Sequence, residues 1–162
     1  MLIYIGADHR GYNLKEYLKG VLQGMGYSVI DVGDDHYNEE DDYVDYATAV
    51  AEKVSVAFDS ARGVLICGSG VGVDVVANKF PRVRSACALT SNQAFDARHD
   101  DDVNVLSLGA NYLKPEEAQK ILLTWLETPF REEERDRRRL KKIEALEIKL
   151  LKPLTLREDD KS

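Results

Sequence analysis

One short segment restricts the possible folds of this chain more than any other. Residues 64–67 are apolar, and glycines follow at the alternate positions 68, 70 and 72. A continuous apolar run bounded by glycine is typical of a central strand in a parallel sheet, because such strands are buried on both faces. The glycines allow a sharp turn whose N–H groups approach a bound anion. Since open α/β sheets bind ligands at the carboxyl ends of their strands, the segment predicts a site directly after this strand.

Apolar strand patterns and amphipathic helical patterns alternate along most of the chain. Strands are expected at 2–7, 27–32, 64–67, 84–89 and 103–108, and helices at 13–24, 43–58, 73–80, 90–99 and 115–125. This alternation predicts an α/β fold with a five-stranded, doubly wound parallel sheet. A long charged helix is expected at 131–150, and its apolar edge predicts packing on a partner subunit. Residues 1–150 are expected to form one domain and residues 151–162 a tail.

Composition excludes several classes of function. The 162 residues carry a net charge of −7 at pH 7, which argues against nucleic acid or an anionic membrane as the main partner. The two cysteines, Cys67 and Cys87, lack metal-type spacing, and Cys87 is interpreted as a buried packing thiol. No membrane-length apolar run and no leader pattern occur, so a cytoplasmic protein is expected. An acidic loop at 33–42 is expected to be exposed or to form a lid.

Three connections that follow predicted strands carry reactive side chains, and all three are expected at the same edge of the sheet. They are Asp8 with His9, Cys67 with Ser69, and the stretch 99–102 that begins with a histidine. Asp8 has a simple alternative role as a helix cap, and Cys67 as a buried strand cysteine. The donor-rich glycine turn after Cys67 favours a reactive thiolate instead.

The charged helix offers a second kind of candidate site. Arg135 and Arg139 are four residues apart, so they share one face and are able to hold a phosphate between two guanidinium groups. A solvated helix face is the simpler alternative, because acidic residues alternate with the basic ones.

Several short motifs occur in order along the chain. They are Gly6–Gly11, Asp42-Tyr43, Cys67–Gly72, Ala77-Asn78-Lys79, Arg84 and Asn104–Leu106. Together they resemble the type B ribose-5-phosphate isomerase family, which also contains the galactose-6-phosphate isomerase subunits. The resemblance implies a Rossmann-like three-layer αβα sandwich, a homodimer or tetramer with active sites shared between subunits, and no metal or organic cofactor.

The resemblance also implies an activity, the aldose–ketose isomerisation of a small phosphorylated sugar through a cis-enediolate, in the pentose phosphate pathway. Cys67 would be the base that moves a proton between C1 and C2. Ser69 and the N–H groups of Gly70, Val71 and Gly72 would stabilise the enediolate oxygen. The implied substrate contacts are Asp8, His9, Tyr43, Gly68, Asp101, Arg135 and Arg139.

The chain departs from the family pattern at four positions. Family members usually carry a ring-opening His where this chain has Asp100, and His99 lies one residue early. One residue on a helix is a rotation of about 100°, so either Asp100 opens the sugar ring or the turn is rebuilt to present His99. Asp101 replaces an Asn, and Asn111 and Asp136 stand where basic phosphate contacts are usual.

Three functions remain open on the sequence. The leading hypothesis is interconversion of ribose 5-phosphate and ribulose 5-phosphate. The acidic substitutions motivate a second, the isomerisation of a different sugar or sugar phosphate. The third is a non-catalytic protein that binds a sugar phosphate, but the retained Cys67 argues against it because binding alone needs no thiol there.

Overall fold

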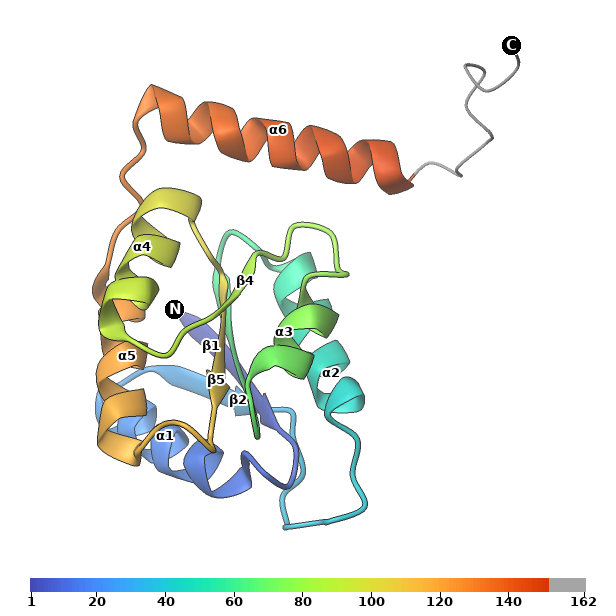
Figure 1. Ribbon diagram of the computed structural model, residues 1–162, viewed down its shortest axis with the longest axis vertical. Helices are drawn as coiled ribbons and strands as arrows, with labels where there is room; N and C mark the ends of the chain where they lie inside the picture. The colour runs from blue at the N-terminus through green and yellow to red at the C-terminus, as the bar shows by residue number, and fades with distance from the viewer. Residues whose placement is uncertain (152–162) are drawn as a thin grey trace. The chain divides into compact units, whose positions relative to one another are not determined.

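The computed structural model describes residues 1–151, and these residues form a parallel sheet with helices on both faces (Figure 1). The strands are β1 (Leu2–Ala7), β2 (Ser28–Asp31), β3 (Ala61–Cys67), β4 (Ser85–Cys87) and β5 (Val105–Gly109). The helices are α1 (Tyr12–Gly24), α2 (Tyr43–Val56), α3 (Val71–Ala77), α4 (Ser91–Asp101), α5 (Pro115–Glu127) and α6 (Glu134–Leu151). The α/β class predicted from the alternating patterns is confirmed.

The five strands pair in the order β2-β1-β3-β5-β4, and every pair is parallel. The glycine-bounded strand β3 therefore lies at the centre, as its apolar sequence predicted. Its last residue, Cys67, is in register with Gly109, the last residue of β5. The carboxyl ends of β1, β3 and β5 consequently meet at one edge of the sheet, and this edge positions the candidate site.

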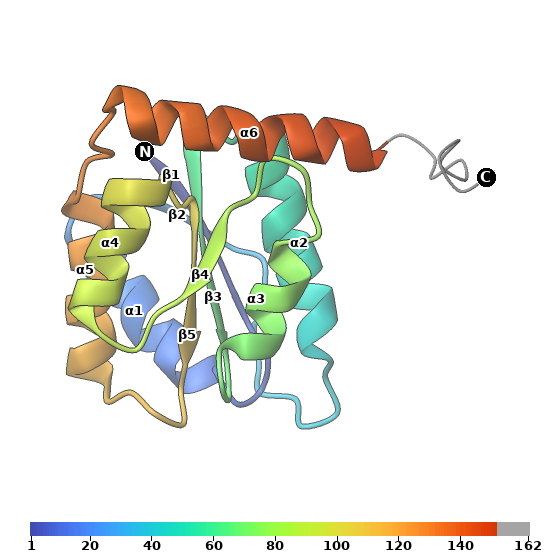
Figure 2. The same cartoon turned by 45° about the horizontal axis from the view of Figure 1, so that its top comes forward.

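Two apolar layers enclose the sheet. Helices α1, α4 and α5 cover one face, and α2 and α3 cover the other (Figure 2). Because side chains alternate along a strand, Ile66 packs into the first layer while Leu65 and Cys67 pack into the second. The Cys67 side chain therefore emerges on the side of α2 and α3, next to the start of α3.

The edge strand β4 is shorter than the predicted range of 84–89. The backbone N–H of Arg84 donates to the side-chain oxygen of Asn104 at 2.8 Å, while the Asn104 amide donates to the carbonyl of Arg82 at 2.8 Å. Asn104 is 1% exposed, so this buried side chain satisfies backbone groups where ladder pairing would otherwise begin. A side-chain contact of this kind explains why the strand starts one residue late.

The chain divides into two compact units, residues 1–130 and the segment from Arg131 onward. The first holds the sheet and its five covering helices, and the second holds α6. Packing of α6 on a partner subunit stays a prediction, and of the expected tail, residues 152–162 lie outside the described residues. No helix within residues 1–151 is long and apolar enough to span a membrane.

The turn from β1 into α1 packs directly on the backbone of β3. A Cβ atom built at Gly11 would lie 2.6 Å from the carbonyl oxygen of Ile66, and the N–H of Asp8 donates to that same oxygen at 3.3 Å. Gly20, inside α1, has nothing within 4 Å of its Cβ position. Gly11 therefore has no room for a side chain, whereas Gly20 has room for one.

We predict opposite effects on stability from adding one methyl group at these two positions. Gly11→Ala should destabilise the fold by about 1–3 kcal/mol, because the backbone of β3 has to move to admit it. Gly20→Ala should stabilise it by roughly 0.5–1 kcal/mol through helix propensity alone. Urea unfolding followed by circular dichroism measures both, and equal stability of the two variants would contradict this packing.

Candidate active site

Cys67 is the last residue of β3 and is 5% exposed. Gly70 follows in a left-handed conformation with φ of 80°, which turns its backbone N–H back toward the sulfur. That N–H donates to Cys67 Sγ at 3.1 Å. The glycine turn therefore holds the thiol in one place and presents a hydrogen-bond donor to it.

The glycine turn rests on the neighbouring strand ends. A Cβ atom at Gly70 would lie 2.8 Å from the carbonyl carbon of Leu108 and 2.9 Å from Cys87 Sγ. Cys87 is half-buried beneath the turn, and burial, together with the negative charge of Asp74, raises the pKa of its thiol. Cys87 thus acts as a packing thiol under the turn, as the sequence suggested.

Ser69 and the start of α3 supply the polar groups nearest to the sulfur. The N–H of Val71 donates to Ser69 Oγ at 3.2 Å, so this hydroxyl oxygen accepts a hydrogen bond from the turn while its own O–H is able to donate to a ligand. The N–H groups of Gly70 and Val71, predicted to face an enediolate oxygen, are instead directed at Cys67 Sγ and Ser69 Oγ. Two of the N–H groups predicted to bind an oxyanion therefore form hydrogen bonds within the turn.

Two side chains from other elements lie against the same turn. The Tyr43 ring, at the start of α2, comes within 2.8 Å of a Cβ position at Gly72. The Arg10 guanidinium, in the β1–α1 turn, lies 2.9 Å from a Cβ position at Gly68. Tyr43 was a predicted contact, whereas Arg10 was seen only as part of a motif. The glycine pattern alone gave no signal for a charged side chain resting on it.

Asp8 has a structural role in the β1–α1 turn, but it is not the helix cap that was its alternative interpretation, because the N-cap of α1 is Gly11 with no side-chain hydrogen bond. Its Oδ1 accepts the backbone N–H of Gly11 at 3.0 Å, and the residue is 6% exposed. Burial raises the pKa of this carboxyl, and the N–H of Gly11 opposes that change. Asp8 thus shapes the turn that carries His9 and Arg10, and any contact with a substrate has to come from its second oxygen.

His9 is paired with a carboxylate that sequence reasoning missed. His9 Nδ1 lies 2.6 Å from Asp41 Oδ1, and the Asp41 side chain is only 3% exposed. The His9 ring also meets the edge of Tyr37 at a centroid distance of 6.2 Å. A carboxylate on Nδ1 fixes the ring orientation and leaves Nε2 as the free nitrogen. Asp41 sits in an acidic run, where nothing in the sequence distinguished it from its neighbours.

The acidic loop at 33–42 is anchored near both ends rather than free. The fully buried Lys15 donates from Nζ to the carbonyl of Asp34 and to Asp31 Oδ2, each at 2.8 Å. Tyr46 Oη donates to Asp34 Oδ2 at 2.6 Å, and burial together with this bond raises the pKa of Tyr46. The prediction of exposure holds for the middle of the loop, while its ends fix Asp41 against the site.

The expectation that residues 99–102 share this edge within one chain is wrong. Arg84, just before β4, donates from Nε to the carbonyl of Asp101 at 3.0 Å, so α4 ends at the amino ends of β4 and β5. At about 3.3 Å per strand residue, that end lies roughly 13 Å from Gly109 along β5. A helix that follows a strand begins at the carboxyl edge and runs back to the opposite one. Its last turn is therefore remote from Cys67 of the same chain.

At that opposite edge the predicted residues form a local cluster. His99 Nδ1 lies 2.8 Å from Asp100 Oδ1, and the His99 ring stacks on Phe95 at a centroid distance of 4.8 Å. Asp102 ends the helix with a left-handed φ of 47° and pairs with Arg84 at 2.8 Å. His99, Asp100 and Asp101 thus stay together, but away from the glycine turn.

The arginine pair of α6 engages an acidic neighbour within its own unit. Arg135 Nε lies 3.3 Å from Asp136 Oδ1, and Arg139 Nη1 lies 3.6 Å from the same oxygen. The hydrogen bond from Arg131 contributes most to lowering the pKa of Asp136 to about 2, so the carboxylate stays charged at neutral pH. Any phosphate held by this pair has to compete with that internal carboxylate.

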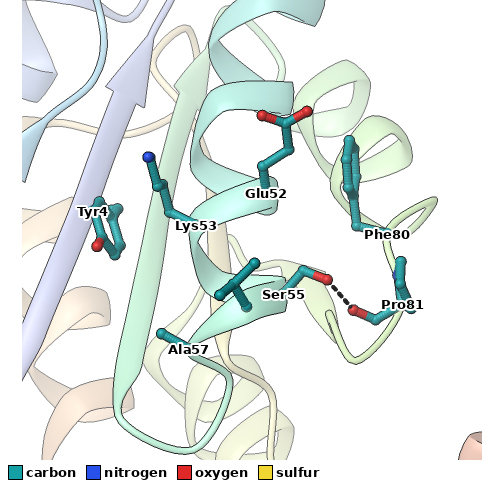
Figure 3. A pocket seen from close by; sticks show the side chains of 8 residues that line it. Tyr4, Glu52, Lys53, Ser55, Ala57, Phe80 and Pro81 are labelled. Carbon is teal, nitrogen blue, oxygen red and sulfur yellow. Dashed lines mark hydrogen bonds between the residues drawn. The ribbon is translucent and has the colours of Figure 1, made fainter.

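A separate hollow of about 680 Å³ lies beside the C-terminal half of α2 (Figure 3). Its lining includes Tyr4, Lys53 and Phe80, and Ser55 Oγ donates to the carbonyl of Pro81 at 2.7 Å along one wall. None of the candidate catalytic side chains lines it. Within residues 1–151, no three His, Cys, Asp or Glu side chains are grouped as metal ligands. The candidate site therefore stays at the glycine turn.

A sequence model of the ribose/galactose isomerase family matches residues 3–143 of the chain. The chain belongs to the ribose/galactose isomerase family. It is 40% identical over 145 residues to a probable ribose-5-phosphate isomerase B from Mycoplasma pneumoniae, an alignment that covers 90% of this chain and 94% of the relative. The family inferred from the motifs is confirmed.

The chain is also similar to two isomerases whose names indicate different sugar phosphates. The crystal structure of ribose-5-phosphate isomerase B from Mycoplasma genitalium with bound ribulose 5-phosphate matches with a TM-score of 0.88 and 37% identity, covering 91% of this chain and 96% of that one. A D-erythrulose-4-phosphate isomerase from Pectobacterium atrosepticum is 35% identical over 128 residues, which are 79% of this chain and 84% of the relative. The second relative acts on a different sugar phosphate from the first.

The His9–Asp41 contact predicts which nitrogen of neutral His9 carries the proton. Because the carboxylate accepts a hydrogen bond from Nδ1–H, the Nδ1–H tautomer should dominate, and Asp41→Asn should shift His9 toward the Nε2–H form. Nitrogen-15 correlation spectra of the imidazoles report this directly. His36 beside Asp35 is the control, because those side chains are 73% and 97% exposed. A wild-type His9 in the Nε2–H form would contradict the contact.

Proposed function

We propose that this chain is a cofactor-free aldose–ketose isomerase that interconverts ribose 5-phosphate and ribulose 5-phosphate. The observation that carries the proposal is the Cys67 thiol, held by a glycine turn at the carboxyl edge of the central strand and facing the start of α3. Family membership and the likeness to a ribulose 5-phosphate complex support the choice of substrate.

Cys67 acts as the base in this mechanism. Its thiolate takes the proton from C2 of the open-chain aldose, the electron pair forms the C1–C2 double bond, and negative charge gathers on O1. Ser69 Oγ, next to the sulfur along the turn, donates its hydroxyl proton as a hydrogen bond to that oxygen. The thiol then returns its proton to C1, the proton of the O2 hydroxyl passes to O1, and the C2 carbonyl of the ketose forms.

Further residues contact the substrate in this proposal. His9 presents Nε2 because Asp41 occupies Nδ1, and Tyr43 closes the site above Gly72. Asp8 offers the sugar the oxygen that does not bind Gly11. Arg135 and Arg139 bind phosphate in this proposal, once Asp136 releases them.

A second copy of the chain completes the site in this proposal. His99, Asp100 and Asp101 lie at the opposite edge of the sheet from Cys67 in one chain, so they reach a sugar at the glycine turn only from a partner. A homodimer or tetramer in the cytoplasm fits that requirement, with Asp100 or His99 of the partner opening the sugar ring. Exposed apolar side chains on α3, Val71 and Val75, support an interface near the turn.

A different sugar phosphate is the second candidate substrate. Asp100 stands where a neutral or cationic ring-opening group is usual in the family, and a related isomerase acts on D-erythrulose 4-phosphate. A four-carbon sugar phosphate cannot form the furanose ring that carries its phosphate on an exocyclic carbon, so it places less demand on ring opening. Assays of both substrates, side by side, decide between the two.

Replacing the thiol tests the proposed base. Cys67→Ser should lower kcat for ribose 5-phosphate by about 10²- to 10⁴-fold, because a hydroxyl is a far weaker source of a base at neutral pH. Cys87→Ser is the matched control, since that thiol packs beneath the turn, and it should retain most of its activity. Turnover measured with EDTA present completes the assay. Full activity of Cys67→Ser would remove Cys67 from the mechanism.

Mixing two inactive variants tests the shared site. Cys67→Ser and Asp100→Asn should each be impaired as pure dimers, whereas a statistical mixture of subunits should regain about a quarter of wild-type activity, because each mixed dimer has one intact site. A mixture of Cys67→Ser with Ser69→Ala is the control and should regain none, since both residues lie on the same side of the site. If His99→Ala is the more impaired variant, it takes the place of Asp100→Asn. Equal recovery in both mixtures would exclude sharing.

A further inference from the structure

Arg10 lies in an unusual place for an exposed arginine. Its Nε, Cζ and Cδ atoms come within 2.8, 2.9 and 3.1 Å of a Cβ position at Gly68, so the guanidinium rests on the backbone of that glycine. Gly68 is the residue between Cys67 and Ser69. The guanidinium therefore lies beside the proposed reaction site while its residue stays exposed to solvent.

No described side chain pairs with this guanidinium. Within residues 1–151, Arg10 forms neither an ion pair nor a side-chain hydrogen bond, whereas Lys15 and Lys19 near the same turn are both paired with Asp31. The carboxylates nearest along the chain have other partners, since Asp8 accepts from Gly11 and Asp41 binds His9. All five guanidinium donors thus remain available to a ligand.

The residue that binds the carbonyl of Gly68 is uncharged. The backbone N–H of Asn111, after β5, donates to the carbonyl of Gly68 at 2.9 Å, so Asn111 and Arg10 flank the same glycine. An edge that carries Asp8, Asp41 and a thiolate repels a phosphate dianion unless a cation is close. Arg10 is the cation that the structure places against the glycine turn.

We propose that Arg10 binds the phosphate group of the substrate through its guanidinium fork. This inference rests on the proposed function for the presence of a phosphorylated sugar, and it adds to Arg135 and Arg139 a phosphate contact within residues 1–130, the unit that holds Cys67. A planar guanidinium is suited to two phosphate oxygens at once. Resting on Gly68 restricts its rotamers before the ligand arrives, so less conformational entropy is lost on binding.

Arg10→Met tests the proposal, with Lys114→Met as the matched control. Lys114 is an exposed cation just before α5 at the same edge of the sheet, and removing it changes the net charge equally. Arg10→Met should raise KM for ribose 5-phosphate by about 10- to 100-fold with little change in kcat, as expected for loss of a charged hydrogen bond. Lys114→Met should leave both constants near their wild-type values, and Arg10→Lys should restore part of the affinity.

Inorganic phosphate provides a readout that does not depend on turnover. Its dissociation constant, measured by titration calorimetry, should rise in Arg10→Met by a factor similar to KM, while the thermal midpoint without ligand stays unchanged. If wild type binds phosphate through Arg10 but does not turn over ribose 5-phosphate, the proposed substrate fails and the role of Arg10 stands.

Two results would overturn the role of Arg10. One is unchanged affinity of Arg10→Met for both ribose 5-phosphate and inorganic phosphate. The other is a fall in kcat at unchanged KM, because it would place the guanidinium on the enediolate oxygen instead of the phosphate.

Discussion

The close approach of three strand ends is the constraint on which the rest of this structure depends. Gly11 packs on the carbonyl of Ile66, and Gly70 packs on Leu108, at distances that no Cβ atom tolerates. These contacts bring the β1–α1 turn and the end of β5 against the residues that follow Cys67. These glycine contacts let the backbone segments pack closely. As a result, the Cys67 thiol, the Ser69 hydroxyl and the side chains of the β1–α1 turn lie near one another.

Ion pairs and hydrogen bonds of charged side chains also fix the loops at this edge of the sheet. The buried Lys15 ties Asp31 to the start of the acidic loop, and that anchoring brings Asp41 against His9. Within this first unit, the acidic side chains beside the site are satisfied by neighbours, and the guanidinium of Arg10 is left open to a ligand. An acidic protein is thus able to present a local cationic group to a phosphorylated sugar.

The sequence predicted the fold and the glycine turn after the central strand because both depend on local patterns. The apolar run before Gly68 identified the central strand, and the motifs identified the family. The edge on which His99 and Asp100 lie was mispredicted, because these residues stand at the far end of the helix that follows β4, and that helix runs back to the opposite edge of the sheet. Asp41 and Arg10 escaped detection since their roles come from long-range contacts, with a histidine 32 residues away in one case and with Gly68 in the other.

The central claim is that a proton, and not a hydride, passes between C1 and C2 by way of the proposed base Cys67, and deuterium incorporation tests this transfer most directly. Wild-type protein and ribose 5-phosphate are held in D₂O until many turnovers have passed, and the sugar is then analysed by proton NMR. The account predicts that deuterium enters at C1 of ribulose 5-phosphate and C2 of ribose 5-phosphate, because the thiol exchanges its proton with solvent. Isomerisation with no deuterium in either position would show a direct hydride shift and contradict the account.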